Sequence, residues 1–179
     1  MKTKLFILLM FFASLGFAQE NQIKDFKKYS VDFSPMSPFI RIYGVQLGYK
    51  LNPKNELLTG LAYTNLHLDP GVTHSPSVIL GYRRYLWRNL HIEYQIWPSY
   101  DNFYAYKEDA YFKSFDIWNE FRFGYQFNFK IKDKSLYTSV QWPFGFGLYS
   151  TNKPQSFKEH EEKEKFFYQF PLWFIGIKF

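Results

Sequence analysis

The chain has 179 residues, contains no cysteine and carries a formal net charge of +6. A chain without cysteine has no disulfides and lacks the lipidated cysteine of a bacterial lipoprotein. Its basic residues are scattered among acidic ones, so nucleic-acid binding is not indicated. Aromatic residues make up 23% of the sequence. That share is typical of the aromatic girdles of membrane barrels rather than of soluble domains.

The first eighteen residues have the layout of a secretory signal peptide. Lys2 and Lys4 form a short basic start, an apolar run follows from Leu5 to Phe12, and Ala18 offers a small residue for cleavage. The apolar run is too short for a stable membrane span. We therefore predict a signal peptide over residues 1–18, a polar lead over 19–27 and one domain over 28–179. Removing Lys2 and Lys4 with the peptide lowers the formal charge from +6 to +4.

Alternation of apolar and polar residues predicts eight β-strands in the domain. The clearest case is Ser114 to Phe129, where odd positions are almost all aromatic or aliphatic and even positions are mostly polar or glycine. In chain order the predicted strands cover residues 28–33, 39–51, 57–66, 77–87, 90–97, 114–129, 137–148 and 166–179.

The predicted connections between these strands alternate in length. The long ones cover residues 34–38, 69–76, 101–111 and 151–165, and the short ones cover 52–55, 88–89 and 130–135. An even number of strands, with long loops at one end and short turns at the other, is the pattern of a bacterial transmembrane barrel.

Glycine placement indicates which face of the strands points inward. A solvent-facing strand position gains nothing from glycine, but the crowded lumen of a small barrel needs small side chains between large ones. We therefore expect the polar face to line the lumen and the aromatic face to point outward. A lipocalin-like or other secreted soluble barrel is the alternative. All eight glycines of the predicted strands fall on the polar face: Gly44, Gly48, Gly60, Gly81, Gly124, Gly145, Gly147 and Gly176.

Some apolar residues also fall on the predicted lumen side. They are Ile40, Leu58, Ile79, Phe170 and Phe174. Either the strand register slips at these positions or the lumen is partly apolar.

With its signal peptide, its alternating strands and its terminal segment Leu172 to Phe179, the chain resembles the small eight-stranded outer-membrane proteins of Gram-negative bacteria. Gln19 after the cleavage site and the many Lys, Tyr and Phe residues are similar to Bacteroidota members of that group. The resemblance implies an all-β fold, an eight-stranded antiparallel up-and-down transmembrane β-barrel in the outer membrane. It places the 19–27 lead in the periplasm and implies contact with lipid and lipopolysaccharide, recognition of Phe179 by the outer-membrane assembly machinery, a monomeric state and no cofactor.

A set of ionisable residues falls on the inward face of the three middle strands. Clustered titratable groups suit an acid/base site or a proton path. The lumen of an eight-stranded barrel is narrow enough to be filled by side chains, however, and buried charges must be paired, so we favour a charge-paired plug. Such pairing also argues against a conducting pore. The set consists of Arg83, His91, Glu93, Asp116, Glu120 and Arg122.

The remaining site candidates are weaker. Asp69, His74, Ser75 and Ser77 offer the residue types of acyl transfer, and the length without the predicted signal peptide resembles that of lipid A acyltransferase and deacylase barrels, but no nucleophile motif accompanies them. We therefore assign no catalytic residue. The four histidines show no metal-ligand spacing, so we predict no metal site. Arg41, on the outward face near the outer rim, is a candidate contact for lipopolysaccharide phosphate.

These observations favour a structural or surface-interaction barrel whose loops carry its recognition. A lipid A-modifying enzyme, and a narrow channel or transporter of small hydrophobic molecules, are the alternative classes.

Overall fold

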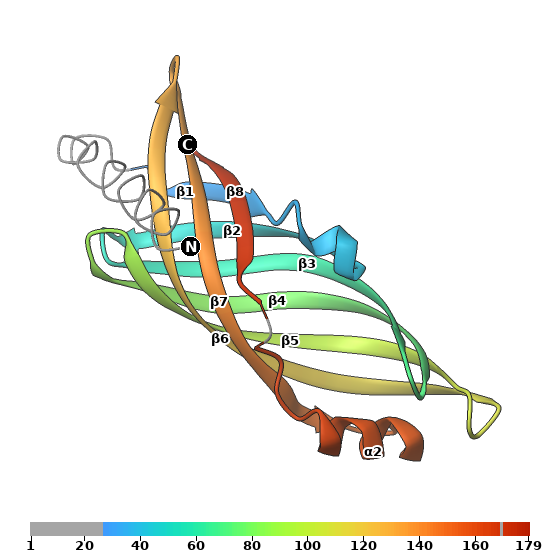
Figure 1. Ribbon diagram of the computed structural model, residues 1–179. Helices are drawn as coiled ribbons and strands as arrows, with labels where there is room; N and C mark the ends of the chain where they lie inside the picture. The colour runs from blue at the N-terminus through green and yellow to red at the C-terminus, as the bar shows by residue number, and fades with distance from the viewer. Residues whose placement is uncertain (1–26, 169) are drawn as a thin grey trace, which may run out of the picture.

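Eight antiparallel strands follow one another around a closed ring in the computed structural model, which describes residues 27–168 and 170–179 (Figure 1). The predicted all-β, up-and-down fold is confirmed. The signal peptide predicted over 1–18, and the lead predicted over 19–27 except for its last residue, lie outside the described residues. The strands are β1 (Tyr29–Phe33), β2 (Ile42–Asn52), β3 (Asn55–Leu68), β4 (Gly71–Trp87), β5 (Leu90–Ala105), β6 (Ala110–Ile131), β7 (Lys134–Ser150) and β8 (Leu172–Lys178).

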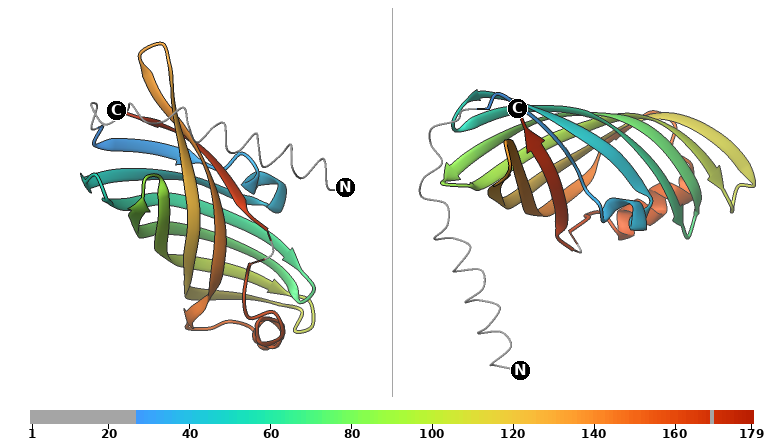
Figure 2. Two further views of the ribbon diagram at one scale, coloured as in Figure 1. Left: turned by 60° about the vertical axis from the view of Figure 1, so that its left-hand side comes forward. Right: turned by 90° about the horizontal axis from the view of Figure 1, so that it is seen from above.

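The two ends of the ring differ in what covers them. One end, here called the terminal end, carries the start of β1, the end of β8 and the short β2–β3, β4–β5 and β6–β7 turns. The other, the cap end, carries the 3-10 helix η1 (Ser37–Ile40), the β3–β4 and β5–β6 turns and the helix α2 (Gln155–Lys163) (Figure 2). No helix in the described part of the chain is both long and apolar enough to cross a membrane.

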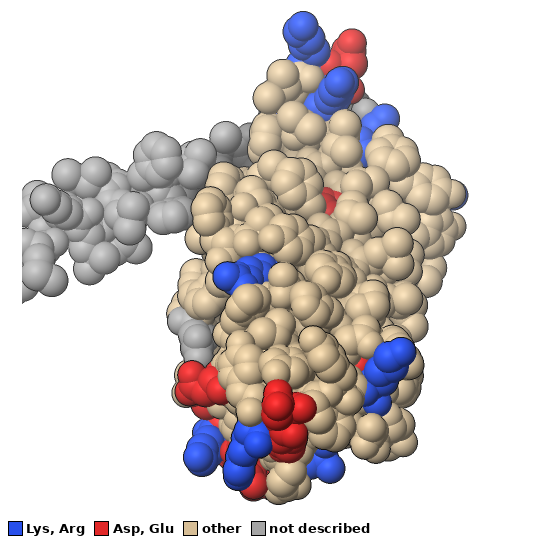
Figure 3. Space-filling view, turned by 90° about the vertical axis from the view of Figure 1, so that its right-hand side faces the viewer, with Lys and Arg blue, Asp and Glu red and all other residues tan. Residues whose placement is uncertain are grey.

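The polarity of the ring is the reverse of that of a soluble barrel. Polar and charged side chains such as Gln95, Glu93 and Ser139 are buried inside, whereas outward positions such as Leu61, Phe121 and Trp142 are apolar and exposed. Figure 3 shows charged side chains gathered towards the two ends of one face, with few between them. The inward direction predicted for the polar face is therefore confirmed.

The lumen is nevertheless partly apolar, which answers the question that the sequence left open. Leu58, Ile79 and Phe174 are buried inside the ring. The strand register does not slip at Leu58 and Ile79, because Leu58 pairs with Gly81 and Gly60 pairs with Ile79 in one continuous ladder. Ile40 belongs to η1 and Phe170 precedes β8, so neither occupies a strand position.

Two predicted long loops are wrong, because the strands continue through them. Residues 71–76 belong to β4, which leaves only a two-residue turn after β3, and the loop predicted over 101–111 shrinks to a turn between Ala105 and Ala110. Pro76, the last residue of the loop predicted over 69–76, pairs with Tyr63 on the β3 side. On the β5 side the ladder is interrupted between the pairs His74–Asn102 and Ser77–Ser99, where a residue without an N–H is tolerated.

The seam that closes the ring is short. β1 and β8 share four residue pairs, from Ser30–Lys178 to Phe33–Ile175, and β8 begins at Leu172 rather than at residue 166 as predicted. The β7–β8 ladder ends at the pair Gln141–Leu172, so the cap-end half of β7 lacks a strand neighbour on that edge. There Phe167 forms an isolated β-bridge with Gly145, and Trp142 Nε1 donates to the Tyr168 carbonyl at 3.0 Å.

Candidate functional site

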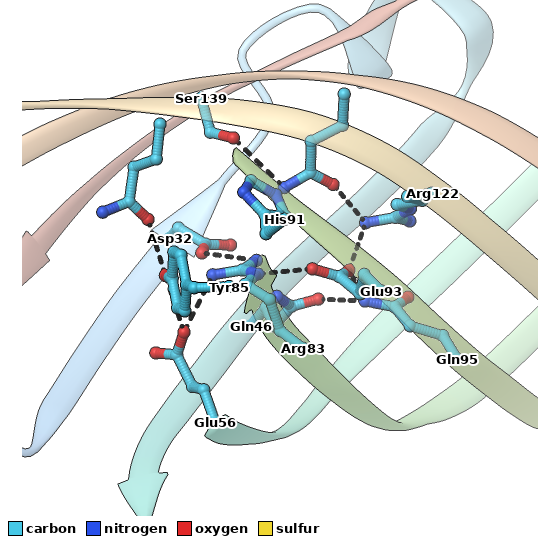
Figure 4. A network of polar contacts seen from close by, with 12 residues as sticks. Asp32, Gln46, Glu56, Arg83, Tyr85, His91, Glu93, Gln95, Arg122 and Ser139 are labelled. Carbon is cyan, nitrogen blue, oxygen red and sulfur yellow. Dashed lines mark hydrogen bonds and ion pairs between the residues drawn. The ribbon is translucent and has the colours of Figure 1, made fainter. Parts of the chain in front are cut away.

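A network of buried ion pairs fills the lumen towards the terminal end (Figure 4). Three central strands supply its core, because Arg83 on β4, Glu93 on β5 and Arg122 on β6 occupy inward positions of neighbouring strands. Arg83 pairs with Glu93 across β4–β5, and Glu93 pairs with Arg122 across β5–β6. Directly opposed residues of antiparallel strands lie close enough for their side chains to interact. Strand alternation and register alone therefore place the three charges together.

Arg83 lies at the centre of this network and is almost completely buried. Its Nε donates to Glu93 Oε2 at 2.6 Å, and its Nη1 donates to Glu56 Oε2 at 3.2 Å. Its Nη2 lies 3.8 Å from Asp32 Oδ2. One guanidinium thus links carboxylates from β1, β3 and β5, as its fork of five donors allows.

Arg122 extends the network towards the cap end. Its Nη1 donates to Glu93 Oε1 at 3.3 Å, and its Nε pairs with Glu120. Gln95 donates from Nε2 to Glu93 Oε1 and to Gln46 Oε1, each at 2.5 Å. Both carboxylate oxygens of Glu93 therefore accept from charged donors.

Two tyrosine hydroxyls form hydrogen bonds with carboxylates of the network. Tyr85 lies 3.0 Å from both Glu56 Oε2 and Gln126 Oε1. Tyr137 on β7 donates to Asp32 Oδ2 at 2.5 Å, across the inner face of β8. Gly176 makes this crossing possible, because it pairs with both Asp32 and Tyr137 and any Cβ there would overlap the Tyr137 ring.

Of the six residues predicted to share the lumen, four form one connected network: Arg83, Glu93, Glu120 and Arg122. His91 is completely buried, but its ring Nδ1 lies 3.2 Å from the carbonyl of Asn89 and its Nε2 has no hydrogen-bond partner among the described residues. Asp116 lies in a separate cluster nearer the cap end, where it accepts from Ser150 at 2.7 Å and pairs with Lys153.

Sequence reasoning missed two acids of the network, Asp32 and Glu56. Asp32 lies on a five-residue strand, and Glu56 lies next to the β2–β3 turn, where alternation is short or interrupted. The alternation of the strands nevertheless predicts that both side chains point inward. Asp32 is two residues from Ser30 and Glu56 is two residues from Leu58, and all four side chains are buried. With these acids included, charge pairing accounts for the cluster, and it resembles a plug more than an acid/base site.

The α2 helix packs against inward-facing residues of β5 at the cap end. Phe157 is buried against Phe103 and Ala105 from β5, with Leu68 and Phe112 packed around them. The Ser156 hydroxyl and backbone N–H donate to Glu108 at 2.7 and 2.8 Å. These hydrogen bonds hold the pKa of the Glu108 carboxyl below its ordinary value.

Lys153 joins the cap to the barrel wall. Its Nζ lies 2.8 Å from Glu161 Oε2 on α2 and 3.1 Å from Asp116 Oδ2 on β6. Burial by itself would lower the pKa of Lys153, but the ion pairs with Glu161 and Asp116 outweigh burial and raise it.

The remaining sequence candidates do not assemble into a site. Residues of β4 alternate, so His74 points outward, with its Nδ1 2.8 Å from the Tyr63 hydroxyl, while Ser75 and Ser77 are buried inside. Within residues 27–168 and 170–179, no group of three or more histidine, aspartate or glutamate side chains is placed to hold a metal ion. Arg41 is exposed at the end of η1, with a φ of 60°.

No protein-family model, curated protein or solved structure matches this chain.

Replacing Arg83 by alanine is expected to destabilise the barrel by roughly 3–5 kcal/mol, because Glu93 and Glu56 would keep buried charges without their partner. The measurement is denaturant unfolding in detergent micelles. Arg84→Ala is the matched control, since Arg84 is the next residue, points outward and is exposed. Its substitution should change stability by about 0.5 kcal/mol or less. Equal stability of the two variants would contradict the network.

Docking of α2 is expected to weaken in acid. The pKa of Glu108 is depressed from 4.5 in the folded chain, so its contact with Ser156 is present above pH 4.5 and is lost as the pH falls through the lower folded value. Pepsin cleavage at Phe157 should therefore increase below pH 4.5. In Glu108→Ala the same cleavage should already occur at pH 5, whereas Glu162→Ala should behave like the unchanged chain. Cleavage of Glu108→Ala only at the wild-type pH would disprove the contact's role.

Proposed function

We propose that this protein is an outer-membrane β-barrel of the structural or surface-interaction type, with a lumen filled by side chains. The observation that carries the proposal is the reversed polarity of the ring. Apolar side chains cover the outside of all eight strands while charged and amide side chains are buried within. In water such an exterior would be a large aggregation-prone surface, whereas in a bilayer it matches the surrounding hydrocarbon.

The contents of the lumen support a closed barrel rather than a pore. Arg83 and Arg122 are each bound by two or more carboxylates, and the tyrosine and glutamine side chains around them bond to one another. At the opposite end Phe157 of α2 is buried against Phe103 and Ala105 of β5. Paired charges leave no row of free ligands along which an ion would pass.

The length of the strands supports a role at the cell surface. A tilted strand crosses a bilayer in about 9–11 residues, but β4 and β7 have 17 residues each, β5 has 16 and β6 has 22. We propose that the β3–β4 and β5–β6 hairpins, together with α2, extend beyond the outer leaflet. Tyr111 there is 82% exposed, which makes this hairpin a natural recognition surface.

The proposed surroundings supply two further partners. Arg41 has no ion pair within the described ranges, and its exposed guanidinium suits a lipopolysaccharide phosphate. Phe179 lies at the terminal end, where its backbone exchanges hydrogen bonds with Tyr29 and its ring stays exposed. That exposure leaves the ring accessible to the assembly machinery of the outer membrane.

Leu61→Arg distinguishes this proposal from a soluble barrel. Leu61 lies midway along β3 and is 64% exposed. In a bilayer, arginine at this depth should cost about 2–4 kcal/mol, whereas the exposed face of a soluble barrel should tolerate it within about 0.5 kcal/mol. Leu51→Arg, near the β2–β3 turn, is the control and should cost about 1 kcal/mol or less. Unfolding from lipid vesicles measures both, and equal small effects would refute the proposal.

A further inference from the structure

A narrow cleft enters the lumen from the side, beside η1 and the start of β8. Its free volume is about 50 Å³, the space of a few water molecules, so it admits a slender single chain rather than a bulky ligand. Its walls are apolar and include Ile40, Ile79, Trp97, Leu172 and Phe174. Its inner end is polar, because Asp32, Gln46 and Arg122 also line it. The lining of the cleft therefore matches an amphiphile whose polar end points into the lumen.

The entrance exists because the seam of the ring is short. Beyond the pair Phe33–Ile175 the chain leaves β1 for η1, and β8 has not yet begun on the other side. Gly44 and Val45 border the cleft, and Val45 pairs with Leu61, which is exposed on the apolar exterior midway along β3. The entrance thus opens sideways into the surroundings of the barrel. That these surroundings are a bilayer rests on the proposed function.

Two residues that line the inner end each have a polar atom without a hydrogen-bond partner in the described part of the chain. Arg83 Nη2, 3.8 Å from Asp32 Oδ2, is a further such atom, but Arg83 does not line the cleft. Asp32 Oδ1 and Gln46 Nε2 are buried atoms without a hydrogen bond to any residue in the described part of the chain. Asp32 is 2% exposed and Gln46 is 4% exposed. The two residues are directly opposed across β1–β2, so their side chains are neighbours. An unsatisfied acceptor therefore lies beside an unsatisfied donor, where buried polar groups normally have partners.

We propose that the cleft binds a single-chain amphiphile with a hydroxyl head, such as a long-chain alcohol, which enters sideways with its head inward. A hydroxyl donates one hydrogen bond and accepts others, so one group satisfies both Asp32 Oδ1 and Gln46 Nε2. The apolar chain then lies along Ile79, Trp97 and Phe174 and extends towards the entrance.

Charge at the inner end excludes a fatty-acid carboxylate as the head. The connected network holds four carboxylates, from Asp32, Glu56, Glu93 and Glu120, against two guanidinium groups, from Arg83 and Arg122. The largely buried ammonium groups of Lys50 and Lys178 lie near Glu56 and offset negative charge in this network, but neither lysine lines the cleft. The charged groups that line the cleft are the carboxylates of Asp32 and Glu120 and the guanidinium of Arg122, so its lining holds one negative charge in excess, since two minus one is one. Arg122 is already committed to Glu93 and Glu120, and its guanidinium lies 5.1 Å from the centre of the Phe174 ring. A further anion would be repelled.

Trp97 provides the reporter for a direct test. Bromine quenches tryptophan fluorescence on contact, so 8-bromo-1-octanol and 8-bromooctanoic acid serve as a matched alcohol and carboxylate at pH 8. The protein is the full chain in phosphatidylcholine vesicles, with Trp87, Trp118, Trp142 and Trp173 replaced by phenylalanine. A second variant that keeps only Trp173, which is exposed on the outside, reports the amount of each compound in the membrane.

Relative to Trp173, Trp97 should be quenched saturably by the alcohol, with at least tenfold weaker binding of the acid. Ile79→Phe, which fills the cleft, should weaken alcohol binding at least tenfold. Leu80→Phe, at the next and outward-facing position, should leave it unchanged. Quenching of Trp97 that rises only in proportion to Trp173 would overturn the proposal and leave Asp32 and Gln46 to bind water. Equal binding of alcohol and acid would overturn the choice of head group.

Two controls keep the outcome decisive. If the variant with four replaced tryptophans does not fold, the quenching lost on Trp97→Phe in the otherwise unchanged chain gives the same information by difference. If brominated phosphatidylcholine fails to quench the Trp173-only variant, the membrane proposal is wrong. Alcohol binding at Trp97 is then measured in detergent, so the failure of one proposal is separate from the failure of the other.

Discussion

Charge pairing inside a ring with an apolar exterior is the constraint on which the rest of this structure depends. An exterior of aliphatic and aromatic side chains leaves the lumen as the only place for the polar half of each strand, and buried charges there are tolerated only in pairs. Arg83 meets this constraint by contacting carboxylates from β1, β3 and β5. The network therefore joins strands that are not neighbours and braces the ring from inside.

Bracing matters most at the seam, where the backbone contributes least. β1 and β8 share only four residue pairs, but Tyr137 reaches across Gly176 to bond Asp32, which also approaches Arg83. Side chains thus connect β7 to β1 and β4 past the short β8. The same shortness removes the wall on the cap side of the seam, where η1 and the segment before β8 replace strands and the side cleft opens. The short β1–β8 seam therefore accounts both for the side-chain contacts that cross it and for the cleft beside it.

The sequence predicted what depends on alternation alone. Strand number, the inward direction of Arg83, Glu93, Glu120 and Arg122, and the outward direction of the aromatic face all follow from a period of two. The sequence-based prediction was wrong where pairing with neighbouring strands decides where a strand begins or ends. Pro76 lies within β4 because β3 pairs with it, and β8 begins only at Leu172 although the composition of residues 166–168 suits a strand. The cleft was invisible in the sequence, because it arises from the unequal lengths of strands at the seam.

The most direct test of this account is the lipid dependence of folding. The chain is unfolded in urea and diluted into buffer alone or into phosphatidylcholine vesicles, and its β-structure is followed by circular dichroism. We predict that native β-structure and resistance to heating on a gel appear only with vesicles, because the apolar exterior needs hydrocarbon around it. A monodisperse, folded and soluble monomer in buffer without lipid would contradict the account.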